Sequence, residues 1–409
     1  MLCGLKRPSK VREKDVEVAA LAALRLGDVK KALQVLNAAP FAPKDEDLIA
    51  LRKLHPEGKS PSPAPGLFGY RPFLLQQCLR AESFSFLRSL SSAVNQLADG
   101  RAPEFLQPYL AGGVSIALAK PLNGVRPLCC GDPIRPLAEK CFCIGGKDEI
   151  SAEFKGRNFG VGCPGGVEVV AHSLRDSLEK HAGSNAALLK IDFRNAFNLI
   201  DRDAFVKASC SMFPGLSKWT MWCYGQPSVL LYDHKHVISS TCGVQQGDPL
   251  GPLYFCCGLA SLVSEIEKFG PVYNKWYMDD GGIIGDVEML QKVWDLLATE
   301  GPKIGLHLNP AKCEWSWLDA SRSDACPIRV TTGDKISLVP TDEIQMLGVP
   351  LGCSSNVAKY VEKKLFSKLK LMVDRLSDFD DSQSAFFLLR VSFSIVRATH
   401  FIRRRWISG

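Results

Sequence analysis

The chain has 409 residues, of which 46% are hydrophobic and 23% are charged. These ordinary globular values exclude a mainly disordered chain, a collagen-like fibre and a long coiled coil, and the length suits two or three packed domains. Lys and Arg number 50 against 43 Asp and Glu, a formal net charge of +7. This mild excess permits a nucleic-acid partner without requiring one.

The 15 cysteines include no C-x-x-C pair, so a structural zinc site has no support in the sequence. We find neither a secretory signal nor an apolar run of about 18 residues. We therefore expect reduced thiols in an intracellular protein, nuclear or cytoplasmic, that is not secreted and does not cross a membrane. Nothing in the sequence indicates an oligomeric state.

The first part of the chain differs from the rest. Leucines recur at helical spacing over residues 15–37, and prolines and glycines cluster over residues 56–66. This pattern predicts a small helical N-terminal extension with a Pro-rich linker over residues 1–66.

From residue 67, expected strands and helices alternate. Apolar periodicity predicts helices over residues 83–98, 166–182, 202–212, 249–269 and 286–299. Short apolar runs predict strands over residues 187–191, 237–244, 272–277 and 282–284, the last two forming a hairpin around residues 278–281. Residues 114–137 are expected to be extended, and residues 305–308 to lead into another strand. The alternation predicts an α/β sheet layer with helices packed on one face.

The last part of the chain is basic, with 11 Lys or Arg against 5 Asp or Glu over residues 359–409. One interpretation is a surface that tracks a nucleic-acid backbone. The other is an ordinary solvated helix face, which charge alone favours.

Three acidic residues are the strongest chemical signal. Asp192 ends one predicted strand, and Asp279 and Asp280 lie at the tip of the predicted hairpin. An Asp-Asp pair alone is ordinary turn chemistry. Carboxylates gathered on adjacent strands without thiolates suit hard cations such as Mg²⁺, and two such ions about 3.5–4 Å apart can activate a hydroxyl and stabilise a leaving pyrophosphate.

The context of this acidic set is specific, since Tyr277-Met278-Asp279-Asp280 resembles the signature of reverse transcriptases. Further segments match motifs of this family in order, over roughly residues 110 to 355: Lys120, Arg126-Pro127, Asp192-Phe193-Arg194-Asn195-Ala196-Phe197, Gln246-Gly247-Asp248-Pro249-Leu250, Gly305-Leu306, Asn309-Pro310, Lys312 and Leu347-Gly348-Val349-Pro350-Leu351-Gly352. The resemblance is closest to the non-LTR retrotransposon type. A truncated copy, a fragment of a larger reading frame and a host-retained polymerase are the three alternatives that stay open.

The resemblance implies a right-hand polymerase fold with an α/β (α+β) palm. In this reading residues 67–185 form a fingers-like region and residues 186–353 form the palm, including the catalytic motifs and a primer-grip-like hairpin. Residues 354–409 would be the basic helical start of a thumb.

The resemblance also implies the metal ligands. Asp192 and Asp279 would bind two Mg²⁺ ions, with Mn²⁺ as an accepted substitute. Asp280 would be a third, less engaged carboxylate, and the backbone carbonyl of Phe193 a further ligand. The sequence departs from the usual patterns at Asn195, where some relatives carry a second acid, and at Gly281-Gly282.

The incoming nucleotide would meet several residues implied by the same resemblance. Phe197 would be a sugar gate that excludes a 2′-hydroxyl, although a core aromatic ring is the plainer interpretation. Gln246 and Gly247 would line the nucleotide and the template base, or else form a simple strand-to-helix turn. Lys120 and Arg126 would hold the triphosphate, with Arg135 a weaker candidate.

Two further roles are implied at the end of the palm. Lys312, seven residues after Gly305, would protonate the pyrophosphate, unless it is simply an exposed lysine. Leu347, Gly348 and Gly352 would belong to the primer grip, unless they form a plain turn.

The resulting prediction is an RNA-directed DNA polymerase whose partners are an RNA template, a DNA or RNA primer and dNTPs. Two alternatives stay open. One is a catalytically idle remnant that only binds RNA or acts as a scaffold. The other is an RNA-directed RNA polymerase, against which Phe197 and Met278 argue.

Overall fold

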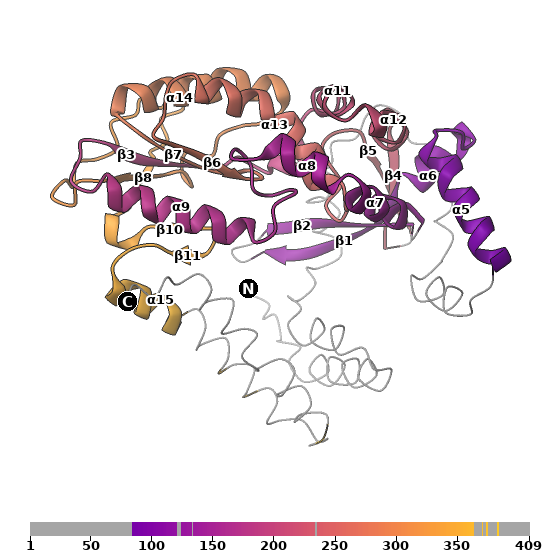
Figure 1. The fold of residues 1–409 in the computed structure, drawn as a ribbon, viewed down its shortest axis with the longest axis horizontal. Helices are drawn as coiled ribbons and strands as arrows, with labels where there is room; N and C mark the ends of the chain where they lie inside the picture. The colour runs from indigo at the N-terminus through magenta and orange to yellow at the C-terminus, as the bar shows by residue number, and fades with distance from the viewer. Residues whose placement is uncertain are drawn as a thin grey trace, which may run out of the picture. The chain divides into compact units, whose positions relative to one another are not determined.

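The structure is a computed structural model that describes residues 84–120, 124–132, 134–233 and 235–363, together with positions 370, 374 and 383 (Figure 1). The predicted extension over residues 1–66 and most of the basic segment 359–409 lie outside the described residues. The chain divides into two compact units. The first described unit runs from residue 84 to 341, and the second covers residues 342–363.

The larger unit is built on a five-stranded sheet in the order β6-β7-β3-β8-β9. Its central strand β3 runs antiparallel to both β7 and β8. Ile191 at the end of β3 pairs with Gly281, so the next residues outward are Asp192 on one strand and Asp280 on the other. The strand bounds are β3 (Ala187–Ile191), β6 (Tyr273–Tyr277), β7 (Asp280–Gly285), β8 (Glu314–Trp317) and β9 (Ser337–Leu338).

Helices cover both faces of this sheet, which corrects the prediction of helices on one face only. Tyr273 of β6 donates a hydrogen bond to the carbonyl of Val170 in α9, at 3.2 Å. Its neighbour Asn274 points the other way and donates to the carbonyl of Val263 in α13, at 3.3 Å. Successive strand residues face opposite sides, and Figure 1 shows α9 and α14 on opposite sides of the strands. The helices are α9 (Gly166–Lys180), α13 (Gly251–Glu267) and α14 (Val287–Glu300).

A second sheet has four strands in the order β2-β1-β4-β5. Strand β1 pairs antiparallel with β2 and parallel with β4, and β4 forms a hairpin with β5. One sheet therefore combines two strands of the predicted fingers region, residues 67–185, with two strands of the predicted palm region, residues 186–353. The bounds are β1 (Gly113–Lys120), β2 (Gly124–Gly131), β4 (Ser228–Tyr232) and β5 (His236–Ser240). The segment predicted to be extended over residues 114–137 forms β1 and β2, and its last residues belong to helix α7. The strand predicted over residues 237–244 is observed as β5, which ends at Ser240.

Shorter helices complete the larger unit. Their bounds are α5 (Phe84–Ala98), η1 (Glu104–Leu106), α6 (Gln107–Leu110), α7 (Ile134–Gly145), α8 (Lys147–Phe154), α10 (Ala196–Leu199), α11 (Arg202–Met212), η2 (Pro214–Leu216), α12 (Ser217–Tyr224) and η3 (Gly301–Ile304). The predicted helices over residues 83–98 and 202–212 match α5 and α11 closely. Residues 305–308 make only an isolated bridge between Leu308 and Phe193, and the next strand begins at Glu314.

The core of this unit lies between the five-stranded sheet, α13 and α14. It contains large buried side chains from all three layers, among them Trp276, Trp315 and Phe255. This packing requires glycine at position 281, because a Cβ there would lie 2.5 Å from the Trp276 ring. Gly281 and Gly282 therefore belong to β7 and leave the hairpin loop to Met278 and Asp279.

The second unit begins after η4 (Thr341–Glu343), the short helix at the junction, and contains a hairpin of β10 (Gln345–Met346) and β11 (Val349–Pro350), then α15 (Ser354–Val361). Leu347 and Gly348 form its two-residue loop with φ of 52° and 73°. Positive φ at both loop residues is the pattern of the tight hairpin turn that matches strand twist. A Cβ at Gly352 would lie 1.6 Å from the carbonyl oxygen of Asp342, which explains that glycine. A hairpin is thus present where the primer grip was predicted.

None of the helices in the described ranges is both long and apolar enough to cross a lipid bilayer.

Candidate active site

A pocket of about 730 Å³ opens at the end of the five-stranded sheet where β3 finishes and the β6–β7 loop turns. Segments far apart in the sequence line it. Among the lining residues are eight of the predicted site residues: Arg126, Asp192, Phe193, Phe197, Gln246, Gly247, Asp279 and Lys312. The tertiary structure therefore brings most of the predicted constellation into one place.

Asp192 is held by a residue to which the sequence assigned no role. The side-chain nitrogen of Asn309 donates to Oδ1 of Asp192 at 2.9 Å, and the backbone N–H of Asn309 donates to the carbonyl oxygen of Asp192 at 2.9 Å. These two bonds connect the end of β3 to the loop before β8. They fix the direction of the carboxylate, and only the Asn-Pro pair in the family motif pointed to this segment.

The acidic pair after β6 is affected by Asp192. Burial is the main reason that the pKa of Asp279 is raised, and repulsion from Asp192 raises this pKa further. A hydrogen bond from the residue's own backbone N–H and the charge of Arg126 both lower the pKa. Burial, together with repulsion from Asp279 and Asp192, raises the pKa of Asp280 to about 6, although part of this side chain reaches solvent. Repulsion of this kind indicates carboxylates that lie close together, and Arg126 and Lys190 offset it only in part.

Asp280 is not among the residues that line the pocket, in contrast to Asp192 and Asp279. It begins β7, opposite Tyr277, and Lys190 of β3 is the cation that lowers its pKa. Asp280 thus lies at the start of β7, outside the pocket that Asp192 and Asp279 line.

Three cationic residues of the described ranges line the pocket: Arg126, Arg194 and Lys312. Arg126 of β2 and Lys312 are both exposed and both line it. Arg126 acts electrostatically on Asp279. Lys120 ends β1 and pairs with Gly124, but its side chain lies outside what the structure describes.

The turn before α13 forms another wall of the pocket. The carbonyl of Gln246 accepts a 2.7 Å hydrogen bond from the backbone N–H of Cys129 in β2. Gly247 has a φ of 118°, and a Cβ there would lie 2.3 Å from the carbonyl oxygen of Cys129. Only glycine allows this close approach between the turn and β2.

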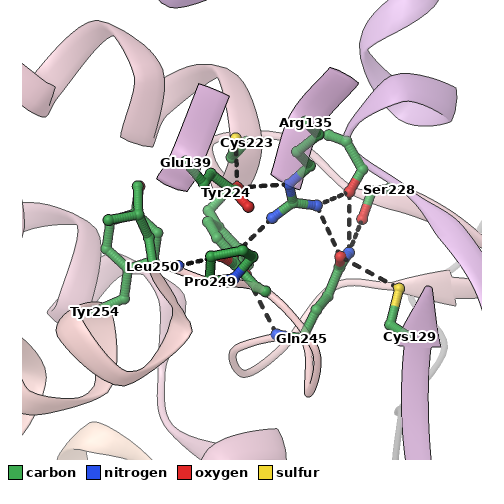
Figure 2. A network of polar contacts seen from close by, with 12 residues as sticks. Cys129, Arg135, Glu139, Cys223, Tyr224, Ser228, Gln245, Pro249, Leu250 and Tyr254 are labelled. Carbon is green, nitrogen blue, oxygen red and sulfur yellow. Dashed lines mark hydrogen bonds and ion pairs between the residues drawn. The ribbon is translucent and has the colours of Figure 1, made fainter. Parts of the chain in front are cut away.

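Arg135 forms hydrogen bonds to side chains on both sides of Gln246 and Gly247 in this turn, and Figure 2 shows the network around it. It is only 3% exposed. Its guanidinium donates to Glu139 at 2.8 Å, to the side chain of Gln245 at 2.7 Å and to Asp248 at 2.8 Å. Tyr224 also donates to Asp248. The weaker prediction that Arg135 holds the triphosphate is therefore wrong, because burial commits its donors to the protein interior.

Phe197 is packed and also lines the pocket. Its ring stacks on Phe255 of α13 with centroids 4.5 Å apart and planes at 9°. The core interpretation and the gate interpretation are thus compatible. Asn195, before it, adopts a φ of 48°, which Asn tolerates better than most residues. Phe193 stacks on Trp276 with centroids 6.2 Å apart.

The donor set is compatible with magnesium without forming a closed cage. In residues 84–363, apart from the few undescribed positions, no three His, Cys, Asp or Glu side chains are grouped tightly enough to hold a metal ion. Mg²⁺ usually uses one or two carboxylates, several waters and substrate phosphates rather than a cage made by the protein alone. Two repelling carboxylates in an open pocket are consistent with that mode.

Comparisons with known proteins agree with the site. Residues 154–351 match the family described as reverse transcriptase (RNA-dependent DNA polymerase). Residues 154–351 therefore carry a reverse transcriptase domain, and the predicted resemblance to this family is confirmed.

A similar curated protein is the retrotransposable element SLACS 132 kDa protein of Trypanosoma brucei gambiense. The two are 28% identical over 269 residues, which covers 61% of this chain and 21% of the relative. The matched region is therefore a small part of that larger protein.

Two solved structures are also similar. Apo telomerase from Candida tropicalis is 14% identical, with 78% of this chain and 66% of that chain covered and a TM-score of 0.44. Telomerase from Candida albicans in complex with a fragment of telomeric RNA is 13% identical, with 74% and 56% covered and a TM-score of 0.42. Both TM-scores are low, so the family assignment comes from the sequence matches.

Proposed function

We propose that this chain is an RNA-directed DNA polymerase that adds deoxynucleotides to a primer 3′-hydroxyl along an RNA template. The observation that supports it best is the 730 Å³ pocket, where carboxylates, cations and aromatic rings meet from distant segments, among them Asp192, Asp279, Arg126, Lys312 and Phe197. Phosphoryl transfer needs positioning and charge neutralisation more than covalent help. A pocket of this composition offers both.

In this proposal Asp192 and Asp279 hold two Mg²⁺ ions, with the Phe193 carbonyl and Asp280 as further contributors. When bound, the ions lower the pKa of the primer hydroxyl and neutralise charge on the phosphates. Asn309 keeps the Asp192 carboxylate oriented.

The other pocket residues have roles in binding the nucleotide. Arg126 and Lys120 hold the triphosphate, and Lys312 gives a proton to the leaving pyrophosphate. Gln246 and Gly247 lie against the nucleotide and the template base, while the Phe197 ring excludes a ribose 2′-hydroxyl.

The proposed domain roles follow the family. Residues 67–185 act as fingers, residues 186–353 as the palm and residues 354–409 as the start of a thumb, with Leu347, Gly348 and Gly352 in the primer grip. The partners are an RNA template, a DNA or RNA primer and dNTPs.

The test is primer extension on an RNA template with the purified chain, Mg²⁺ and dNTPs. We expect extension by the wild type, none without divalent ions, and a loss of about 10³-fold or more in Asp279→Asn, because electrostatic stabilisation is usually the largest catalytic contribution. Asp295→Asn removes an exposed aspartate on α14 and is the matched control.

A wild-type chain that folds and binds RNA in a salt-sensitive way, yet adds no nucleotide, would contradict the proposal and favour the idle remnant. Extension with rNTPs in preference to dNTPs would instead favour an RNA-directed RNA polymerase.

A further inference from the structure

The loop that carries Asp279 has an unusual backbone. Met278 and Asp279 form the two-residue connection between β6 and β7, and Met278 has a φ of 55°. This left-handed region is favoured by glycine and is strained for a side chain such as methionine. Something in the surrounding structure must therefore hold this residue in place.

One buried side chain contacts both backbone polar groups of Met278. Oδ1 of Asn158 accepts from the Met278 N–H at 3.0 Å, and Nδ2 of Asn158 donates to the Met278 carbonyl at 3.2 Å. Asn158 is 4% exposed. A single amide thus satisfies the donor and the acceptor of the residue immediately before Asp279.

Asn158 is itself fixed by the backbone around it. The N–H of Phe159 donates to the carbonyl of Trp276 at 2.8 Å, and the N–H of Trp276 donates to the carbonyl of Arg157 at 2.9 Å. The N–H of Gly160 donates to the same Oδ1 of Asn158 at 3.0 Å. Residues 157–159 therefore run beside β6 and hold the amide rigidly at the end of that strand.

Gly160 lets the two segments come together. A Cβ at this position would lie 2.5 Å from Cγ and 2.8 Å from the backbone nitrogen of Met278. The close approach of residues 158–160 to the β6–β7 loop therefore depends on the identity of two residues in this segment. It requires glycine at one position and an amide two residues earlier.

We propose that Asn158 is a positioning residue that fixes the direction of Asp279 through the backbone of Met278. This rests on the proposed polymerase function of the pocket. Asn158 lies 120 residues before Met278 and is not among the residues that line the pocket, so it acts on the carboxylate only through the loop.

The test compares two buried asparagines in the full chain. Asn158→Leu removes the clamp. Asn274→Leu removes an amide of β6 that donates to Val263 and Glu267 of α13 and accepts from the indole N–H of Trp276. Both variants lose buried hydrogen bonds, so both should melt at lower temperature. Asn158→Asp keeps the two bonds that Oδ1 accepts and loses only the bond donated to the Met278 carbonyl, so it serves as a second variant.

Two readouts separate positioning from a general structural role. Amide hydrogen exchange at Met278 and Asp279, measured without metal or nucleotide, should become faster in Asn158→Leu and stay as in wild type in Asn274→Leu. In primer extension, kcat should fall about 10–100-fold in Asn158→Leu with little change in the KM for dNTP, because a small misplacement of a reacting group is costly. Asn158→Asp should give smaller changes of both kinds.

Equal kcat values and equal exchange in the two leucine variants would overturn the positioning role. A wild-type chain without polymerase activity would overturn the proposed function instead, and the exchange comparison would then decide by itself whether Asn158 holds the loop.

Discussion

Asn309 binds Asp192 twice, once through its side chain and once through its backbone, each time at 2.9 Å. The two residues lie 117 positions apart. One asparagine therefore connects the loop before β8 to the carboxylate at the end of β3.

We predict that Asn309→Ala lowers kcat of primer extension by about tenfold, since a carboxylate freed from its orienting bond samples unproductive directions. The Mg²⁺ concentration that gives half-maximal rate should rise as well. Asn185→Ala is the control, because this exposed asparagine precedes β3 and lies at the opposite end of that strand from Asp192. Unchanged magnesium dependence in Asn309→Ala would contradict an orienting role.

Phe197 should decide between deoxyribose and ribose. Phe197→Ala opens space at the pocket, so incorporation of rNTP relative to dNTP should rise by about tenfold or more, because removing a steric clash changes discrimination between the two sugars. Competition between labelled nucleotides measures it. Phe197→Tyr keeps the ring and should keep the selectivity, and an unchanged ratio in Phe197→Ala would assign the ring to the core alone.

Gly247→Ala should destabilise the turn before α13. The new Cβ would approach the carbonyl oxygen of Cys129 at 2.3 Å, in a backbone with φ of 118°. Strain and overpacking together predict a loss of about 2–4 kcal/mol in the free energy of unfolding. Gly215→Ala meets nothing within 4 Å and is the matched control. Chemical denaturation compares the two, and equal losses would show that the turn can move away from β2.

Arg135 should contribute to stability rather than to substrate binding. Arg135→Met leaves two buried carboxyl groups without their cation, which predicts a loss of about 3–5 kcal/mol in unfolding free energy. Arg101→Met removes an exposed ion pair with Asp99 and should change stability little. If Arg135→Met kept its stability but lost affinity for dNTP, the assignment to the interior would be wrong.

Glu139 should make stability depend on pH. Its single cation Arg135 also pairs with Asp248, and its Oε2 has no hydrogen-bond partner within the described part of the chain. Burial raises the pKa of Glu139 from 4.5 to about 8, repulsion from Asp248 adds to this, and Arg135 opposes it. An unpartnered oxygen is less costly on a neutral carboxyl group than on a charged one, so the folded state keeps this proton.

Because the folded pKa lies above the unfolded value, the folded state binds more protons between these two pH values. Stability from this group is therefore complete below about pH 4.5 and is lost as the pH rises towards about 8. Glu139→Gln removes the titration, so its unfolding free energy should fall less than that of wild type over this window. Parallel pH curves for the two proteins would contradict the prediction.

Local patterns predicted much of the chain's secondary structure. Helix α11 and strand β3 begin and end where the sequence placed them, because α11 follows an apolar period and β3 is a short apolar run that is almost wholly buried. The β6–β7 hairpin also follows from its sequence. The strand expected after residues 305–308 begins only at Glu314, since Leu308 makes a single bridge before the chain turns.

The sequence by itself determined the acidic residues, the order of the family motifs and the glycines that permit close approach, because each is a property of short segments. Only the tertiary structure decided that Arg135 is interior, that Asn309 and Asn158 hold the two pocket carboxylates or their backbone, and that helices cover both faces of the sheet. These relationships join residues about a hundred positions apart, and they depend on strand register and burial, which no local period encodes.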